Sequence, residues 1–321
     1  MRAFLLAAGF GTRLRPLTLC RPKPLVPVCG LPMLDYAAAL CRKHGLESAV
    51  VNAHWLPEQV VAWAQAHAMD LHVSVEAPDI LGTGGGLKRA LPQLGEGFVV
   101  VNGDILCDVD LSALLEGLER RDAMFALRRP DPGQHYGVVA ADATGTLVDL
   151  VGLGTAEAEG AVDRSTHFTG VHALRRGVVE GLPDGESCIV RQGYAHHVAT
   201  RRIGTLVHEG TWFDVGTPQA YLQANLLAVQ RQLSLPLDPF AWATEPPADR
   251  TQGAVWIGEG AVLQPGCTVG PRAVIGAGAI VESGATVEDS VVWDGCTVPA
   301  GTHLKGAIVY DRGILHPGTG S

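Results

Sequence analysis

The chain has 321 residues, of which 47% are hydrophobic and 18% charged, and its formal net charge at pH 7 is −9. This length suffices for one large core or two domains. The negative charge argues against a nucleic-acid-binding protein, because phosphate backbones attract basic surfaces. Seven cysteines form no C-x-x-C pair, which favours reduced thiols over disulfides or zinc ligands. No apolar run approaches the roughly 20 residues that span a bilayer, and no signal segment opens the chain, so we expect a cytoplasmic protein without membrane contact.

The first element is an apolar run over residues 3–8, which predicts a buried parallel strand. In the turn that follows, Gly9 and Gly11 allow a sharp bend and bring backbone N–H groups close to a bound anion. Arg13 and Lys23 add two positive charges, and the prolines on both sides of Lys23 fix its backbone. A loop of this kind suits the phosphates of a nucleotide.

Two common nucleotide loops do not match this segment. The Walker pattern G-x-x-x-x-G-K-[ST] is absent from the chain. The dinucleotide fingerprint needs a third glycine where Leu14 stands. The segment is therefore a nucleotide-binding candidate of another type.

From residue 33 to residue 118 the chain alternates helix and strand patterns. Helices are expected at 33–44, from residue 57 onwards, at 84–94 and at 111–118, and strands at 48–53, 71–75 and 98–101. This alternation predicts an α/β fold with a Rossmann-like, mostly parallel sheet that carries helices on both faces. Ligands of such sheets bind at the carboxyl ends of strands, and both the glycine-rich turn and Asp104 follow predicted strands.

The middle of the chain has a different pattern. Strands are expected at 137–141, 146–150 and 168–174 with no helix between them, which predicts an antiparallel addition to the sheet. Thr217-Pro218 marks the start of another helix. Four prolines then break regular structure between residues 234 and 252, where we expect a linker.

A repeat of six residues follows this linker. Large apolar residues recur at every sixth position, with small residues four places after most of them: Ile257, Leu263, Val269, Ile275, Val281, Val287 and Trp293. This period predicts a short hexapeptide β-helix over residues 253–321, whose repeated residues point inward. Only about three coils fit, so we expect the end of the stack to be covered by a second copy of the chain in a homo-oligomer.

Four motifs together resemble the sugar-1-phosphate nucleotidyltransferases. They occur in family order at Gly9–Pro27, Leu81–Gly86, Val101–Asp104 and Trp212–Pro218, and span about residues 1–232. The resemblance implies a nucleotide-diphospho-sugar transferase fold over residues 1–233. It also implies that the linker at 234–252 joins this domain to a left-handed β-helix. The pattern as a whole is most similar to mannose-1-phosphate guanylyltransferases.

The family reaction joins a nucleoside triphosphate to a sugar 1-phosphate and releases pyrophosphate. Two polyanions must meet, so charge neutralisation and alignment should supply most of the rate. The resemblance implies that Arg13 holds the departing phosphates and that Lys23 stabilises charge at the α-phosphate. It also implies that Asp104 and Asp214 hold Mg²⁺, which takes one or two carboxylates together with phosphate oxygens.

Further site residues are implied by the same motifs. The nucleotide site would comprise Leu6, Ala7, Ala8, Gly9, Gly11, Thr12, Arg13, Glu76, Gly82, Thr83 and Asn102, and the sugar site Gly137, Thr169 and Gly170. Glu76 only accepts hydrogen bonds when ionised, which suits the N1–H and N2–H₂ groups of guanine better than the single N3–H of uracil. The family often places a lysine on the sugar phosphate within a Glu-Lys-Pro segment, but residues 147–160 contain no lysine.

Three other interpretations stay open at this point. A uridylyltransferase acting on N-acetylmuramate 1-phosphate or a hexose 1-phosphate fits the same motifs, including the absent Glu-Lys-Pro segment. A regulatory subunit that binds a nucleotide sugar without turnover is disfavoured, because Arg13, Lys23, Asp104 and Asp214 are all retained. A hexapeptide acyltransferase needs a catalytic histidine, and only His303 and His316 follow the linker. We therefore expect the β-helix to serve assembly or regulation.

Overall fold

The computed structural model describes residues 1–153 and 155–318. Contacts between Cα atoms divide the chain into two compact units. The first, here called the sheet unit, comprises Met1–Phe10 and Ala37–Trp212. The second, here called the β-helix unit, comprises Gly11–Tyr36 and Phe213–Ser321. The N-terminal glycine-rich segment is therefore divided after Phe10, and most of it is grouped with the C-terminal part of the chain.

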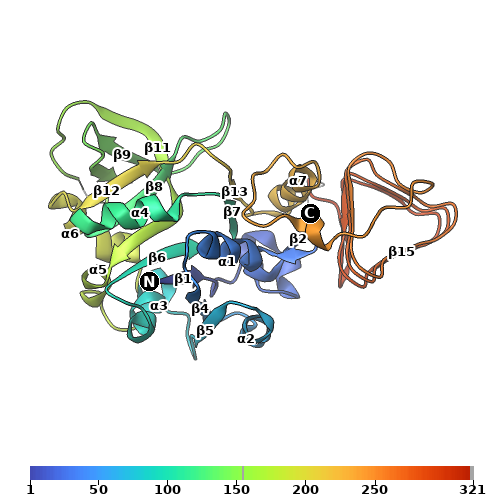
Figure 1. The fold of residues 1–321 in the computed structure, drawn as a ribbon, viewed down its shortest axis with the longest axis horizontal. Helices are drawn as coiled ribbons and strands as arrows, with labels where there is room; N and C mark the ends of the chain where they lie inside the picture. Colours follow the sequence, from blue (N-terminus) through green and yellow to red (C-terminus); the bar gives the residue numbers. More distant parts are fainter. Residues whose placement is uncertain (154, 319–321) are drawn as a thin grey trace. The chain divides into compact units, whose positions relative to one another are not determined.

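The sheet unit is built on a mixed sheet in the order β10-β9-β11-β6-β1-β4-β5, with β8 paired to β11 and β12 paired to β8 (Figure 1). Its parallel part consists of β1 (Arg2–Leu6), β4 (Ser48–Ala53), β5 (Asp70–Val75) and β6 (Gly97–Asn102). Strands β1, β4 and β6 are apolar runs because both faces are covered, and Phe4, Val50 and Val100 are fully buried. The edge strand β5 is more polar and partly exposed. The expected mostly parallel core is confirmed.

The expected antiparallel addition is also present. The long strand β11 (Val162–Arg175) runs antiparallel to β6, to β8 (Ala123–Arg128) and to β9 (Val138–Asp142). The chain continues from β9 into its antiparallel neighbour β10 (Leu147–Leu150), and β12 (Ile203–Val207) lies parallel to β8. This part places β9, β10 and β11 on one side of β6 in the sheet.

Five helices begin and end close to their expected positions: α1 (Met33–Lys43), α2 (Pro57–Ala66), α3 (Gly82–Ala90), α4 (Leu111–Gly117) and α7 (Pro218–Val229). Two short helices, α5 (Arg176–Glu180) and α6 (Tyr194–Ala199), were not expected from the sequence. Side-chain caps explain two of the starts: Asp110 accepts from Ala113 N, and Thr217 accepts from Ala220 N. Short strands β2 (Pro27–Val28), β3 (Leu31–Pro32), β7 (Ile105–Cys107) and β13 (Trp212–Asp214) complete this part of the chain.

The C-terminal repeat forms a β-helix of three parallel sheets, which Figure 1 shows as stacked coils with a triangular outline. One sheet comprises β14 (Val255–Ile257), β17 (Ala273–Ile275), β20 (Ser290–Val292) and β23 (Ile308–Tyr310), with β24 (Gly313–Leu315) antiparallel at its end. The other two comprise β15 (Val262–Leu263), β18 (Ile280–Val281) and β21 (Thr297–Val298), and β16 (Thr268–Val269), β19 (Thr286–Glu288) and β22 (His303–Lys305). The first six repeated apolar residues pack inside this core, as the six-residue period predicts.

The seventh repeated residue, Trp293, does not pack inside this core. Ile257 pairs with Ile275 three hexads later, but Ile275 pairs with Val292, one residue short of the next three hexads. The missing residue falls at the turn of Asp289, whose φ is +49°. Val292 therefore takes the inward position, and the expectation that Trp293 points inward is wrong. Trp293 remains buried, but outside the β-helix core, where its Nε1 donates to Tyr221 Oη at 2.9 Å.

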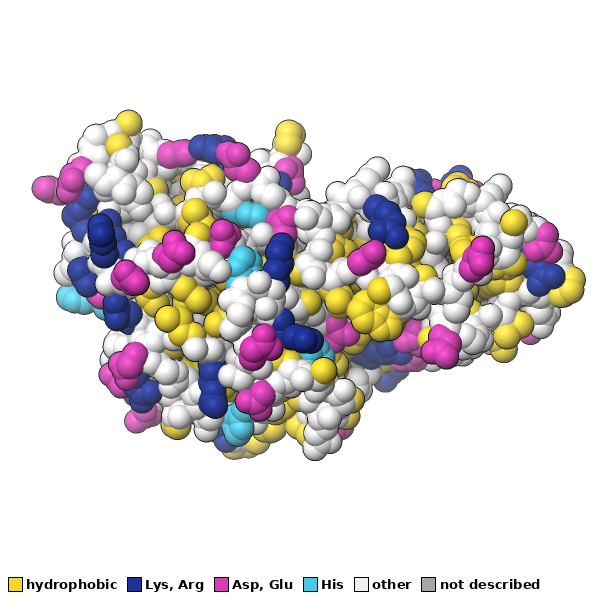
Figure 2. Space-filling view, viewed as in Figure 1, with side chains coloured by type: hydrophobic (Ala, Val, Ile, Leu, Met, Phe, Trp, Pro, Cys, Tyr) yellow, Lys and Arg dark blue, Asp and Glu magenta, His cyan; other side chains and the backbone are white. Residues whose placement is uncertain are grey.

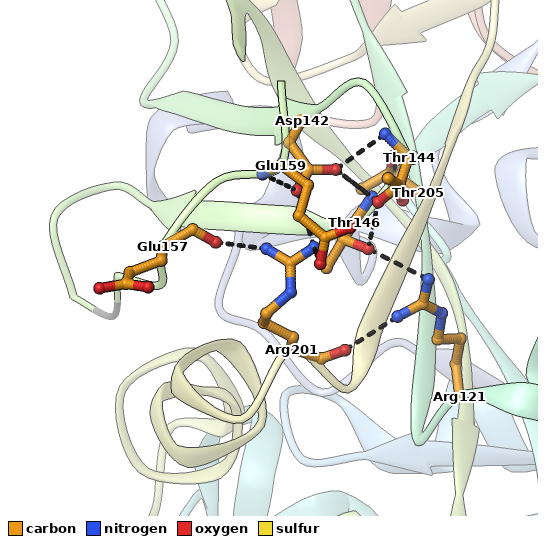
Figure 3. Close-up of polar contacts among 9 residues, drawn as sticks. Arg121, Asp142, Thr144, Thr146, Glu157, Glu159, Arg201 and Thr205 are labelled. Atoms are coloured by element: carbon orange, nitrogen blue, oxygen red, sulfur yellow. Dashed lines mark hydrogen bonds and ion pairs between the residues drawn. The ribbon is translucent and has the colours of Figure 1, made fainter. Parts of the chain in front are cut away.

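A buried carboxylate holds together the β9–β10 hairpin and the segment after α6 in the sheet unit (Figure 3). Its Oδ2 accepts from Arg201 Nη2 at 2.9 Å and from Glu159 N at 2.9 Å. Its Oδ1 accepts from the Thr144 hydroxyl at 2.6 Å, and from the N–H groups of Thr144 and Thr146. This residue is Asp142, whose side chain has no exposed surface. Burial alone would raise the pKa of Asp142, but the hydrogen bonds from Thr144, Glu159 and Arg201 outweigh it and hold the pKa well below its usual value.

Replacing Asp142 with Asn should destabilise the folded chain by about 2 kcal/mol at pH 7, because an amide donor would face buried donors. The depressed pKa makes this stabilisation fully present above the carboxyl pKa of the unfolded chain. This stabilisation is lost as the pH falls through the lower pKa of Asp142 in the folded chain. The difference in unfolding free energy between variant and wild type should therefore decrease in acid. Urea unfolding at pH 7 and at pH 3 measures both effects. Asp163→Asn is the matched control, because Asp163 is a more exposed carboxylate in the same part of the sheet, and it should cost less than about 1 kcal/mol. Equal losses for the two variants would contradict this account.

The surface shows no concentration of one charge on the face drawn in Figure 2, where Lys and Arg side chains are interspersed with Asp and Glu. This distribution agrees with the scattered basic residues of the sequence and gives no basic stripe that would follow a phosphate backbone. Among the described residues, no helix is both long and apolar enough to cross a bilayer.

Candidate functional site

The glycine-rich segment folds into three consecutive 3-10 turns in the β-helix unit, here called the signature loop (residues 11–25): Thr12–Leu14, Leu17–Leu19 and Lys23–Leu25. Gly11 starts it with φ +59°. A Cβ on Gly11 would lie 2.8 Å from Thr18 Cγ2 and 2.9 Å from Lys23 Cβ, so only glycine fits. Thr18 Oγ1 also donates to Gly11 O at 2.9 Å. In the sheet unit, Gly9 has no left-handed φ and a Cβ there would enter open space, so the bend depends on Gly11.

Two cations and one carboxylate meet in the β-helix unit. Lys23 is only 7% exposed, and its Nζ lies 3.8 Å from Asp214 Oδ1. A Cβ on Gly216 would lie 3.2 Å from both carboxylate oxygens of Asp214 and 3.3 Å from Arg13 Nη1. Gly216 therefore lets the Arg13 guanidinium and the Asp214 carboxylate approach the same stretch of backbone. Strand β13 ends at Asp214, and α7 begins four residues later behind its Thr217 cap, which fixes this turn.

This group can bind a polyanion together with a cation. Lys23 is a buried point charge on a restrained backbone, whereas Arg13 is exposed and can form forked hydrogen bonds to phosphate oxygens. Asp214 is partly exposed and supplies a hard oxygen ligand. The structure thus brings together three of the predicted site residues, Arg13, Lys23 and Asp214.

In the sheet unit, the carboxyl ends of the parallel strands meet at one edge. Leu6, at the end of β1, is in register with Asn102, at the end of β6, and Gly103 N donates to Leu6 O at 2.9 Å. Asp104 follows directly and is partly exposed. Gly170 approaches from β11, where a Cβ would lie 2.5 Å from Asn102 Nδ2. Predicted nucleotide, metal and sugar residues are therefore neighbours at this edge.

A buried polar chain joins β1, β4 and β5 behind this edge. Ala7 N donates to Asn52 Oδ1 at 2.7 Å, Asn52 Nδ2 donates to Glu76 Oε1 at 2.7 Å, and Leu81 N donates to Glu76 Oε2 at 2.7 Å. Asn52 and Glu76 are each 1% exposed. Sequence reasoning missed Asn52, although a polar residue near the end of an apolar strand is a signal of this kind of site.

Glu76 has a structural role in this chain. Both of its oxygens accept from protein donors, and a Cβ on Gly86 would lie 2.5 Å from its Oε1. Glu76 therefore positions Leu81, the residue before the start of α3, relative to the end of β1. A direct contact of Glu76 with a base stays a prediction.

The glycine run that opens α3 packs against residues 185–189. Gly84 N and Gly85 N donate to Ser187 O at 2.8 and 3.4 Å, and Ile189 N donates to Thr83 Oγ1 at 3.2 Å. A Cβ on Gly82 would lie 2.7 Å from Ser187 O. These N–H groups are therefore satisfied by the protein itself rather than left for an anion. The hydroxyl proton of Thr83 remains available to donate, as its predicted place in the nucleotide site requires.

The predicted sugar residues lie beside an aromatic group. Tyr136 stacks on His167 with ring centroids 4.3 Å apart, and Trp212 meets His167 edge-on at 4.8 Å. Trp212 Nε1 donates to Thr169 O at 2.9 Å, and Thr169 Oγ1 donates to Ala126 O, so Thr169 is a fixed, buried support. Burial lowers the pKa of His167, which keeps the imidazole neutral near pH 7. Gly137, next to Tyr136, would place a Cβ 2.7 Å from Val151 Cγ1. An aromatic face of this type suits the C–H face of a sugar ring.

The carboxylates of the described residues suit an open divalent-metal site rather than a closed one. Within the part of the chain that the structure describes, no group of three or more His, Cys, Asp or Glu side chains gathers as a complete protein cage. Asp104 lies in the turn after β6 and Asp214 at the end of β13, and both carboxylates are partly exposed. Mg²⁺ typically uses one or two carboxylates and completes its shell with water and phosphate oxygens. Each of these two carboxylates therefore suits Mg²⁺ better than it suits a metal that is held entirely by protein ligands.

Replacing Glu76 with Gln should raise KM for the nucleotide by about tenfold for every base, because one acceptor becomes a donor that faces Asn52 or Leu81. Initial rates with several nucleoside triphosphates measure this effect, and kcat should change by less than about threefold. Glu58→Gln, on the exposed first turn of α2, is the control and should leave KM unchanged. A changed preference among bases, without a common rise in KM, would show that Glu76 reads the base instead.

Comparison with known proteins gives two family matches. The family described as nucleotidyl transferase matches residues 2–231, and the family described as the GMPPB C-terminal domain matches residues 251–316. HddC from Yersinia pseudotuberculosis has a similar fold, with a TM-score of 0.57, 21% identity, and coverage of 70% of this chain and 97% of HddC.

Two kinds of curated relative are similar in sequence. N-acetylmuramate alpha-1-phosphate uridylyltransferases from Neisseria meningitidis and Caulobacter vibrioides are 30% and 34% identical, over 71% and 70% of this chain and 98% and 95% of their own lengths. The mannose-1-phosphate guanylyltransferase of Mycobacterium tuberculosis is 29% identical over 96% of this chain and 79% of its own length. The first kind matches only part of the chain, whereas the second matches nearly all of it.

Proposed function

We propose that this chain, which belongs to the nucleotidyl transferase family, joins GTP to mannose 1-phosphate. The family match and the relatives make it a sugar-1-phosphate nucleotidyltransferase. The products would be GDP-mannose and pyrophosphate. The observation that carries this choice is the second family match over residues 251–316, together with guanylyltransferase relatives that align over nearly the whole chain.

The proposed reaction assigns a task to each charged residue. The oxygen of the sugar phosphate attacks the α-phosphorus in line while pyrophosphate leaves, so no general base is needed. Lys23 would stabilise the charge that develops at the α-phosphate, and Arg13 would hold the departing phosphates by forked hydrogen bonds. We propose Asp104 and Asp214 as the carboxylates that hold Mg²⁺, which when bound would neutralise phosphate charge.

The nucleotide and sugar contacts are proposed from the same motifs. Backbone groups of residues 6–12 would line the triphosphate, and Thr83 and Asn102 would contact the base and ribose. Gly137 and Gly170 would let a hexose approach the backbone, and Thr169 supports that wall through its bond to Trp212. The aromatic rings beside Gly137 support these assignments.

A uridylyltransferase that uses UTP and N-acetylmuramate 1-phosphate is the second candidate. It is favoured by the 34% identity to the Caulobacter relative and by the lack of lysine in residues 147–160. A non-catalytic regulatory subunit is the candidate of another class, and the combined retention of Arg13, Lys23, Asp104 and Asp214 argues against it.

We also propose a cytoplasmic homo-oligomer that assembles through the β-helix. The described cysteines are all unbonded, which supports a reducing compartment. A short β-helix needs its end strands covered, which supports a second copy of the chain. Light scattering of the intact chain tests the assembly, and a monomer at micromolar concentration would contradict it.

The substrate proposal is tested by incubating the chain with Mg²⁺, each of GTP, UTP, dTTP, ATP and CTP, and each of several sugar 1-phosphates. Pyrophosphate release should be fastest with GTP and mannose 1-phosphate. Faster release with UTP and N-acetylmuramate 1-phosphate would replace the first candidate with the second. Binding of a nucleotide sugar without release from any pair would favour the regulatory subunit.

A further inference from the structure

Trp293 lies outside the β-helix core because one coil is a residue short. The shortened coil puts Val292 in the inward position, so the next side chain faces away from the core. An indole that leaves a hydrophobic core has to be buried elsewhere, and Trp293 is 1% exposed. The residues that bury Trp293 therefore indicate what role the β-helix has in this protein.

One element that covers Trp293 is the signature loop. The Arg21 guanidinium lies over the indole, with Cζ 4.6 Å from the ring centroid. Arg21 Nη1 is 4.0 Å from Asp294 Oδ2, and Arg21 Nη2 is 3.6 Å from Asp311 Oδ1. A planar cation stacked on an indole and flanked by two carboxylates is held on three sides. Both carboxylates belong to the β-helix, so this end of the loop is attached to its last coils.

Two further contacts extend this attachment along the loop. Trp293 Nε1 donates to Tyr221 Oη at 2.9 Å, and the Tyr221 hydroxyl donates to Pro27 O at 2.6 Å. Arg312 Nη2 donates to Leu19 O at 3.3 Å. The backbone is therefore held just before and just after the turn that contains Lys23.

Lys23 has little freedom of its own to correct a displaced loop. It is buried, its Cβ packs against Gly11, and its Nζ must stay near Asp214. A small shift of the backbone between Leu19 and Pro27 would therefore move the ammonium group directly. Preorganising such a loop increases the fraction of molecules that are ready to bind the nucleotide.

We propose that the β-helix positions the signature loop through the contact of Arg21 with Trp293, Asp294 and Asp311. Arg21 and Trp293 are positioning residues, since neither is assigned a contact with substrate. The inference rests on the proposed function for its effect on turnover, but the effect on the shape of the loop does not depend on that function. It gives the β-helix a task in nucleotide binding in addition to assembly.

The test uses the full-length chain with Arg21→Gln and Trp293→Leu, and with Arg21→Lys and Trp293→Phe as conservative variants. Lys305→Gln is the matched control, because it removes a cation of the β-helix that pairs with Glu288 at 2.7 Å. Hydrogen exchange of the peptide covering residues 11–25 is measured by mass spectrometry for each variant. Kinetic constants are then measured for the nucleotide and for the sugar phosphate.

Arg21→Gln and Trp293→Leu should each speed exchange in residues 11–25 by about tenfold and raise KM for the nucleotide by a similar factor. The kcat at saturating nucleotide should stay within about twofold, because the nucleotide itself restores the loop. Trp293→Phe should recover most of the wild-type exchange rate and KM. The double variant Arg21→Gln/Trp293→Leu should have an exchange rate and a KM no higher than those of either single variant. Unchanged exchange in residues 11–25, or a loss confined to kcat, would overturn the proposal. If no substrate pair reacts, exchange alone still decides it.

Discussion

The Asp104→Asn variant should fold like the wild type and lose at least about 10³-fold in kcat/KM, or about 4 kcal/mol of transition-state stabilisation. Asp104 is partly exposed and follows the Gly103 N–H that donates to Leu6 O, so an isosteric amide fits without strain. An amide is a much weaker ligand for Mg²⁺ than a carboxylate, and charge neutralisation between two polyanions would be lost.

Pyrophosphate release measures this loss, and circular dichroism and the thermal midpoint show whether the variant is folded. Asp110→Asn is the control, because Asp110 caps α4 and Asn is an equally good cap. It should keep wild-type activity. A folded Asp104→Asn variant with more than about a tenth of wild-type kcat/KM would remove Asp104 from the metal assignment.

Replacing Lys23 with Met should lower kcat by about 10² to 10³-fold, with a smaller effect on KM. Its charge would act at the α-phosphate, where negative charge grows in the transition state, so ground-state binding depends on it less. Met keeps the length and the burial of the side chain, and the loop should keep its three turns.

Lys23→Arg should not restore kcat, because the side chain is buried and its Cβ lies against Gly11, which leaves little space for a wider guanidinium. Lys43→Met, on the exposed last turn of α1, is the control for loss of one positive charge. Initial rates over a range of both substrates give the two constants. A Lys23→Met variant that changes KM alone would place Lys23 in ground-state binding and contradict its proposed task.

The features that sequence reasoning found are those with a local pattern. The strand before the glycine-rich turn, the strand that ends at Asn102 and the six-residue period each depend on neighbouring residues. Arg13, Lys23 and Asp214 were found because the motifs that contain them resemble a family, and the structure brings these three together.

The features that sequence reasoning missed depend on contacts between distant segments. Asn52 matters because β4 pairs with β1 and β5, which no local pattern shows. Trp293 keeps the six-residue period in the sequence, but the coil that contains it is one residue short, and only strand pairing shows this. The binding partner of the α3 glycines, Ser187, lies about a hundred residues away and has no recognisable motif of its own.

As a sugar-1-phosphate nucleotidyltransferase, this chain should transfer a nucleotidyl group from a nucleoside triphosphate to a sugar 1-phosphate. The most direct measurement follows nucleotide sugar and pyrophosphate in one reaction, with Mg²⁺, GTP and mannose 1-phosphate, by chromatography and an enzymatic pyrophosphate assay. The account predicts equal amounts of both products and no pyrophosphate when the sugar phosphate is omitted. Pyrophosphate or phosphate released without sugar phosphate, with no nucleotide sugar formed from any substrate pair, would contradict it.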